Sequence, residues 1–260
     1  MNNTSKTSSR KTIVILTAIL VLLVLLGLVI ALIPAYDHYY LTHVKYPVYG
    51  GMTKELKDCE LYDDMRSGRS ICFLGDSITS GAETKGIPWY QPLIPYIKGN
   101  ISNLSCGGWQ VYHLNHQQEY IPVSDIYVVA IGINDIGFPK SMYGAHSGEE
   151  YVRDLEKLAG IIKEVSPNAK IYFIAPWIFF DKGEECEKAG VDFRKALADW
   201  SSKTEYICID PVPVLSSEIN SGNRDHYLLD GVHPNSPYGT GMYSYAVLKA
   251  DHDRRAASKQ

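Results

Sequence analysis

From about residue 70 onward, short apolar runs alternate with longer stretches in which apolar residues recur at helical spacing. The clearest runs cover residues 71–74, 125–131, 170–175 and 206–209, and a weaker one covers 101–105. Runs that are apolar on both faces are typical of strands in a parallel sheet covered on both sides. The pattern therefore predicts an α/β fold in which helices separate mostly parallel strands.

Three stretches between or after these runs are expected to be helices: residues 149–165, 192–200 and 238–250. In the first of them, Val152, Leu155 and Ile162 recur at a spacing that places them on one helical face. Pro92 and Pro95 fall where a helix after the first strand would continue. Because proline breaks a helix interior, that helix is expected to be short or kinked.

Residues 13–35 form an apolar run without a charged side chain. At about 1.5 Å per residue, a helix of this length spans the roughly 30 Å hydrocarbon core of a membrane. Lys6, Arg10 and Lys11 precede the run, and Tyr36 begins a group of tyrosines after it. This arrangement favours a single-pass anchor in the cell membrane, with the C-terminal part outside the cytoplasm.

The competing interpretation is a cleaved signal peptide, whose apolar region is normally about 7–15 residues long. The run here is longer, and its Ile-Pro-Ala end at residues 33–35 is a poor cleavage site. If the segment is instead a cleaved signal peptide, the protein is secreted. A buried core helix is disfavoured, because one face of such a helix is normally polar.

The formal net charge is −4, and residues 1–35 carry three basic and no acidic side chains, so residues 36–260 carry −7. No basic cluster stands out there, which excludes nucleic acid as an expected partner. The five cysteines match no metal-site spacing. Their odd number argues against a complete disulfide framework, but a Cys186–Cys208 pair stays open. Cys72, inside the first strand, is expected to be a small buried residue.

A serine follows the first predicted strand in the segment Gly75-Asp76-Ser77. A serine hydroxyl becomes a useful nucleophile only when a neighbouring base takes its proton. Here the strand ends in a turn, and the residues after Ser77 can open a helix whose N-terminus favours developing negative charge. The alternative interpretation of Ser77 is an ordinary helix N-cap.

About 150 residues later, Asp230 precedes His233 by three positions. This short spacing lets the carboxylate hold the imidazole in one tautomer while the other ring nitrogen faces a serine. The alternative is a surface turn, because Asp-Gly and His-Pro pairs both favour turns.

Two further signals follow predicted strands. Gly107 and Gly108 come after the second strand, and a glycine there lets a backbone N–H approach a substrate oxygen closely. Asn134 comes after the third strand, and its side chain can donate a hydrogen bond to an oxyanion. An ordinary loop and a strand-ending turn are the alternatives.

In this order, the four signals resemble the SGNH hydrolases, also called the GDSL esterase/lipase family. The matching blocks are Gly75-Asp76-Ser77, Gly107, Gly132-x-Asn134-Asp135 and Asp230-x-x-His233, and the resemblance covers roughly residues 70–250. It implies a three-layer α/β/α sandwich with about five mostly parallel strands, preceded here by the transmembrane helix. It implies no metal and no other cofactor.

The resemblance also implies a role for each matching residue. Ser77 is expected to be the nucleophile, His233 the general base and then acid, and Asp230 the carboxylate that orients the imidazole. The oxyanion hole is expected to consist of the Ser77 and Gly107 backbone N–H groups and the Asn134 side chain.

The chain is accordingly divided into a disordered cytoplasmic tail (1–11), a transmembrane anchor (12–35), a stalk or lead-in partly packed on the domain (36–68) and a hydrolase domain (69–260). A long segment at 138–148 is expected to face substrate, although a solvated surface loop is an equal alternative. Trp89, Trp109 and Trp177 lie near strand ends and could form a sugar-stacking platform, but aromatic residues more often belong to the core. The expected substrate contacts are Trp109, Asp135, Tyr143 and His146.

The leading functional hypothesis is an extracytoplasmic serine esterase that removes small acyl groups, most plausibly acetyl, from carbohydrates. The alternative is an O-acetyltransferase for cell-wall or exopolysaccharide sugars, in which a sugar hydroxyl replaces water and a membrane partner supplies the acyl group. A third hypothesis is a non-catalytic carbohydrate-binding module. The intact set of Ser77, Asp230 and His233 argues against that module.

Overall fold

The computed structural model describes residues 3–138 and 141–259, with side chains from Leu16 onward. Its centre is a five-stranded sheet in the order β2-β1-β3-β4-β5, and every neighbouring pair is parallel. The strands are β1 (Ile71–Gly75), β2 (Ile101–Ser105), β3 (Ile126–Ala130), β4 (Lys170–Ile174) and β5 (Ile207–Ile209). Each lies within one residue of the predicted run at both ends, so the strand predictions are confirmed.

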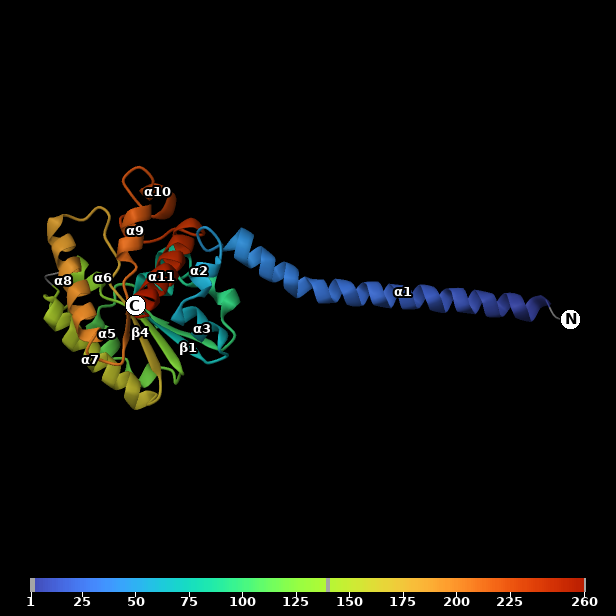
Figure 1. Cartoon of the computed structure of the whole chain (residues 1–260), viewed down its shortest axis with the longest axis horizontal. Coiled ribbons are helices and arrows are strands. Elements are labelled where there is room, and N and C mark those ends of the chain that lie inside the picture. Colours follow the sequence, from blue (N-terminus) through green and yellow to red (C-terminus); the bar gives the residue numbers. More distant parts are fainter. Residues whose placement is uncertain (1–2, 139–140, 260) are drawn as a thin grey trace.

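Alternate side chains of β1, β3, β4 and β5 enter two separate cores, one on each face of the sheet. In β1, Ile71 and Phe73 belong to one core, whereas Cys72 and Leu74 belong to the other. The first core is covered by α2 (Lys54–Lys57), α3 (Glu60–Arg66) and α11 (Tyr238–Ala257), and the second by α5 (Val111–Asn115), α7 (Gly148–Val165) and α8 (Glu184–Ser201) (Figure 1). The predicted three-layer sandwich is therefore confirmed.

The three predicted helices are confirmed, and two of them are longer than predicted. The stretch 149–165 corresponds to α7, whereas 192–200 and 238–250 are parts of the longer helices α8 and α11. The helix after β1 is short, as the prolines predicted: α4 (Ser77–Ser80) has four residues. Pro92 and Pro95 lie in the 3₁₀ segment η3 (Gln91–Tyr96). The remaining short helices are α6 (Ile133–Gly137), α9 (Val212–Glu218) and α10 (Arg224–Tyr227).

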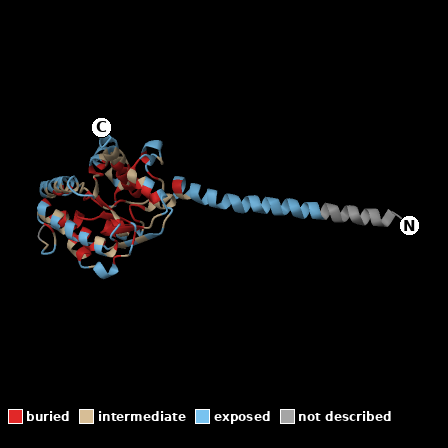
Figure 2. Ribbon diagram, turned by 60° about the horizontal axis from the view of Figure 1, so that its bottom comes forward, coloured by how far each residue is buried: buried red, intermediate tan, exposed pale blue. Residues whose placement is uncertain are grey.

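The N-terminal helix α1 (Asn3–Tyr40) runs away from the domain as one long helix with a bend near the domain, and it is followed by the π-helical turn η1 (Leu41–Lys45) (Figure 1). Residues Leu16–Lys45 are long and apolar enough to cross a membrane, a test that a signal sequence would also pass. The most apolar part of this stretch makes no buried contact with the rest of the protein, which excludes a core helix (Figure 2). Residues 3–11, expected to be a disordered tail, continue this helix, and residues 1–2 lie outside the described part.

Part of the predicted lead-in, residues 36–68, lies inside the folded unit. Leu56 of α2 and Leu61 and Met65 of α3 are each 1% exposed and belong to the first core. The backbone N–H of Leu61 donates to the buried carboxylate of Asp251 on α11 over 2.7 Å. The packed domain therefore begins before residue 69, the predicted boundary, and its last residue, 260, is outside the described residues.

The structure decides two alternatives about individual side chains that the sequence left open. Trp89 and Trp177 are 0% and 1% exposed and meet edge to face at 5.6 Å between ring centroids, so they are core residues and not a sugar platform. All five cysteines are free, so Cys186 and Cys208 are not paired. Cys72 is fully buried, as expected for a small residue within a central strand.

Candidate active site

Three of the predicted site segments meet at the carboxyl edge of the sheet. Ser77 follows β1, the turn from Cys106 to Trp109 follows β2, and Asn134 follows β3. Because β2 and β3 flank β1 on opposite sides, Ser77 lies at the point where the strand order reverses. Ligands of open parallel sheets bind at such a switch point.

Ser77 is held on a tightly packed turn. A Cβ on Gly75 would overlap the carbonyl oxygen of Ala130 in β3 and approach Thr79 Cβ to 2.7 Å, so only glycine fits there. Asp76 caps α4 by accepting the Ile78 N–H at 3.0 Å, and Gly81, at φ +71°, ends the helix. These contacts place the Ser77 side chain at the edge of the sheet with 7% of the residue exposed.

The structure brings Ser77, His233 and Asp230 into one hydrogen-bonded chain. Ser77 Oγ lies 2.8 Å from His233 Nε2, and His233 Nδ1 lies 2.8 Å from Asp230 Oδ2. The other oxygen of Asp230 accepts the backbone N–H groups of Val232 at 2.8 Å and His233 at 2.7 Å. Burial raises the pKa of Asp230, but these hydrogen bonds outweigh it and hold the pKa below its ordinary value. Asp230 is therefore an anion that can keep a proton on Nδ1 and leave Nε2 free to accept one.

The loop that carries His233 is fixed mainly by hydrogen bonds. Tyr243 of α11 donates its hydroxyl to the carbonyl oxygen of Val232 at 2.7 Å, and Asn235 donates its side-chain amide to His226 O at 2.8 Å. A Cβ on Gly231 would overlap the carboxylate of Asp181, so glycine allows the loop to pack against that residue. Asn235 and Tyr243 were not foreseen from the sequence, because their partners are backbone oxygens.

Two of the three predicted oxyanion donors adjoin the same cavity. The backbone N–H of Ser77 has no hydrogen-bond partner within the described residues. Asn134 donates one amide hydrogen to Trp109 O at 2.9 Å, which leaves its second amide hydrogen available. Gly107 lies on an exposed turn beside this site and does not line the cavity; the turn is tied to β1 by the Cys106 N–H, which donates to Gly75 O at 3.4 Å.

A cavity of about 270 Å³ opens at Ser77 and is lined by Asn134, Asp230 and His233 among others. Three of its lining residues, Phe179, Asp181 and Lys182, were missed in the sequence. They follow β4 in the chain, and the carboxyl ends of parallel strands share one edge of the sheet. That rule, applied to the fourth strand as well as to the first three, would have found them.

The predicted substrate contacts separate into different environments. Tyr143 lines a second cavity of about 640 Å³, whereas His146 and the half-buried Trp109 line neither cavity. Residues 139–140 of the expected substrate-facing segment lie outside the described part. Asp135 is 1% exposed and accepts the backbone N–H groups of Ala145 at 3.1 Å and Val111 at 3.4 Å. The prediction for Asp135 is therefore wrong: it joins two loops and does not face substrate.

Buried carboxyls underlie the site. Burial raises the pKa of Asp135 to about 7 despite its two backbone hydrogen bonds. Burial, reinforced by the charge of Asp135, also raises the pKa of Asp76 to about 7. One oxygen of Asp76 has no hydrogen-bond partner in the described chain. Both groups hold a proton more firmly than an exposed aspartate does.

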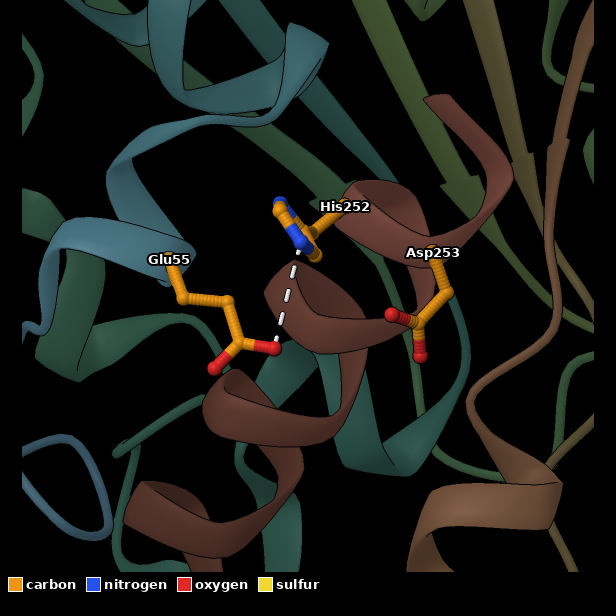
Figure 3. A group of neighbouring side chains, drawn as sticks. All are labelled: Glu55, His252 and Asp253. Atoms are coloured by element: carbon orange, nitrogen blue, oxygen red, sulfur yellow. Dashed lines mark ion pairs between the residues drawn. The ribbon is translucent and has the colours of Figure 1, made fainter. Parts of the chain in front are cut away.

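Away from this site, Glu55, His252 and Asp253 come close enough to hold an ion (Figure 3). His252 Nε2 lies 3.8 Å from Glu55 Oε1, and Lys249 Nζ lies 3.2 Å from Glu55 and 2.6 Å from Asp253. The lysine ammonium already pairs with both carboxylates, so the cluster is explained as a surface ion-pair network. The expectation that the reaction needs no metal stays a prediction.

With the geometry described, comparison with known proteins decides the family. Residues 73–237, more than half of the chain, match the model of the GDSL-like lipase/acylhydrolase family. This chain belongs to that family. This protein is therefore a carboxylic ester hydrolase that acts on acyl esters, as the resemblance implied. No curated protein matches the sequence significantly.

Solved structures agree with the family fold. A Parabacteroides merdae protein described as a GDSL-like lipase superposes with a TM-score of 0.60 at 22% identity, covering 72% of this chain and 97% of that one. An acetylxylan esterase from Geobacillus stearothermophilus gives a TM-score of 0.57 at 19% identity, covering 72% of this chain and 95% of that one. At these identities the likeness supports the fold alone.

Proposed function

We propose that this family member is a serine esterase that hydrolyses acetyl and other small acyl esters of carbohydrates. The observation that carries the proposal is the unbroken hydrogen-bonded chain from Ser77 through His233 to Asp230, with 2.8 Å at each link. It opens into a cavity whose volume of about 270 Å³ suits a small acyl group better than a long one. The acetylxylan esterase with the same fold adds carbohydrate to the substrates worth testing.

In the proposed mechanism, Ser77 Oγ attacks the ester carbonyl while His233 Nε2 takes the hydroxyl proton. The negative charge on the carbonyl oxygen is stabilised by the Ser77 N–H, the Asn134 amide and the Gly107 N–H of the adjoining turn. His233 then protonates the departing alcohol, which leaves an acyl-serine. Water, deprotonated by the same nitrogen, attacks the acyl-serine, and His233 returns the proton to Ser77 Oγ as the acyl–oxygen bond breaks and the acid leaves.

Hydrolysis is favoured over transfer to a second sugar, because the site is open to water. The side chain of Asp230 is 52% exposed and that of His233 is 20% exposed. An acyl-enzyme at Ser77 is therefore within reach of solvent, whereas a transferase gains from a site that excludes water.

We further propose that α1 is an uncleaved anchor and that the hydrolase domain lies outside the cytoplasm. Lys6, Arg10 and Lys11 precede the apolar segment, which favours a cytoplasmic N-terminus. The substrate would then be an acylated carbohydrate of the cell surface or of the surroundings.

The test is acetate release by the full chain in detergent, from p-nitrophenyl acetate and from an acetylated xylo-oligosaccharide. Ser77→Ala and His233→Ala should each abolish release, and unacetylated oligosaccharide added as acceptor should gain no acetyl group. Acetyl transfer to the acceptor at the expense of free acetate would establish the transferase instead. Release that survives both substitutions would reject the assigned residues.

A further inference from the structure

A second, larger cavity adjoins the catalytic one and has no role in the mechanism above. Its volume is about 640 Å³, within the range of about 300–1,000 Å³ that is usual for small-molecule sites. Gly137 and Phe138 line both cavities. A ligand that passes over Phe138 can therefore occupy both at once. We call the second cavity the Tyr143 groove, after the aromatic residue on its wall.

The wall of the Tyr143 groove offers a flat aromatic surface. Tyr143 is 45% exposed, and behind it the ring of Tyr112 stacks at 4.8 Å between centroids and 30° between planes. The imidazole of His113 meets Tyr143 edge to face at 6.0 Å. Tyr143 thus packs against two rings while nearly half of it stays exposed on the groove wall, where it can serve as a stacking surface for a sugar ring.

Polar groups complete the groove with one donor and one acceptor. The Nδ1 atom of His113 accepts the backbone N–H of Gln110 at 3.0 Å, so the ring proton lies on Nε2, which has no partner within the described residues. Glu185, in the first turn of α8, lines the groove with an exposed carboxylate that forms no ion pair in the described chain. Hydroxyl groups both donate and accept, so they can satisfy the two side chains together.

The charges in the groove disfavour other ligands. Its lining includes the exposed carboxylate of Glu185, which repels the negative charge of a phosphate or a lipid headgroup phosphate. A long acyl chain would leave the Glu185 carboxylate and the His113 N–H facing hydrocarbon, at a cost in free energy. A ligand with an apolar ring face and hydroxyl edges fits both parts of the wall.

We propose that the Tyr143 groove binds the alcohol half of the ester as a neutral oligosaccharide. One sugar ring lies on Tyr143, and its hydroxyl groups pair with His113 and Glu185. The proposal rests on the proposed function, since it places the acyl group in the cavity at Ser77 and the sugar beyond Phe138.

The groove is also linked to the oxyanion site. Gln110, which is 3% exposed, donates its side-chain amide to Asn134 O at 3.2 Å and accepts the Ser141 hydroxyl at 2.9 Å. Gln110 and Ser141, which line the groove, are therefore joined by hydrogen bonds to Asn134. A sugar seated in the groove would rest on the residues that position an oxyanion donor.

The experiment compares kcat/KM of the full chain in detergent for two esters, the acetylated xylo-oligosaccharide and p-nitrophenyl acetate. Tyr143→Ala should lower the ratio of the first value to the second about tenfold, mainly through KM for the sugar ester. Tyr143→Phe, which keeps the ring, should restore most of the ratio, and Glu185→Gln should lower it less than Tyr143→Ala. Tyr120→Ala is the matched control, because Tyr120 is 67% exposed and lies outside the groove.

The outcomes separate this proposal from the proposed function. If the parent hydrolyses neither ester, the proposed function fails. If the parent hydrolyses both and Tyr143→Ala leaves the ratio at the parent value, only the groove proposal fails. A loss confined to p-nitrophenyl esters of longer acids would show that the groove holds an acyl chain, which would also overturn the proposal.

Discussion

The two segments that form the hydrogen-bonded chain are built in opposite ways. The nucleophile turn, residues 75–81, is buried and held by close packing, with Asp76 at 0% and Ser77 at 7% exposure. The base loop, residues 228–235, is more open, and the side chain of Asp230 is 52% exposed. It is held by hydrogen bonds to backbone atoms, such as that of Leu229 N–H to His233 O at 2.8 Å.

The difference shows where each kind of substitution should act. In the nucleophile turn a single added carbon meets backbone that cannot move, so changes there should cost stability. In the base loop a polar side chain can be exchanged for one of the same shape without opening a cavity, so changes there should cost turnover.

The largest effect is expected for Asp230→Asn in the base loop. An asparagine oxygen can still accept the N–H groups of Val232 and His233, so the free energy of unfolding should change by about 1 kcal/mol or less. The amide in place of Oδ2 cannot accept the Nδ1 proton, which forces the wrong imidazole tautomer. The turnover number for p-nitrophenyl acetate should fall roughly 10⁴-fold.

Asp225→Asn is the matched control for this substitution. Asp225 lies on α10, close to the base loop in sequence, and its side chain is 94% exposed. Turnover should stay at the parent value. A fall of less than tenfold for Asp230→Asn would mean that Asp230 does not fix the tautomer of His233.

A smaller effect, on stability, is expected for Gly75→Ala in the nucleophile turn. The added Cβ would collide with the Ala130 carbonyl and with Thr79, so urea unfolding should show a loss of about 1–3 kcal/mol. Gly160→Ala is the control, because Gly160 lies inside α7 with open space around it. The control should gain roughly 0.5–1 kcal/mol. Equal effects at both positions would contradict the close packing described for Gly75.

The same contrast explains what the sequence could predict. The five strands and the Ser77, Asn134, Asp230 and His233 positions were predictable, because apolar runs and short spacings between functional groups are local signals. The sequence pattern could not separate Asp135 from a substrate contact. Its burial depends on Val111 and Ala145, which other loops bring to it.

Long-range packing also decided the points that the sequence left open. Trp89 and Trp177 lie near strand ends in the sequence, but the first core closes over both. Part of the expected lead-in packs on the domain, where the Leu61 backbone N–H donates a hydrogen bond to Asp251, 190 positions away in the sequence. The cavity is also lined by Phe179, Asp181 and Lys182, because the segment after β4 ends at the same edge of the sheet. Their residue types alone do not indicate a place in the site.

The last effect is on the pH dependence of stability and concerns the buried carboxyl beneath the nucleophile. The pKa of Asp76 is about 7 in the folded protein, above the ordinary value of 3.8. Between these values the folded state keeps a proton that the unfolded state has released. The free energy of unfolding should therefore fall as the pH rises from about 4 to about 7, by at most about 1.4 kcal/mol per pH unit for this group.

Asp76→Asn removes that contribution, so its stability should decline less steeply over the same range in urea unfolding followed at about pH 4.5 and about pH 7. Some decline should remain, because Asp135 has a pKa raised in the same direction. Asparagine is also a good N-cap, so the helix start at Ser77 should survive. The exposed Asp199→Asn is the control and should keep the parent slope. If the free energy of unfolding changed equally with pH in Asp76→Asn and in the parent, Asp76 would be ionised in the folded protein. The nucleophile turn would then contain a buried negative charge.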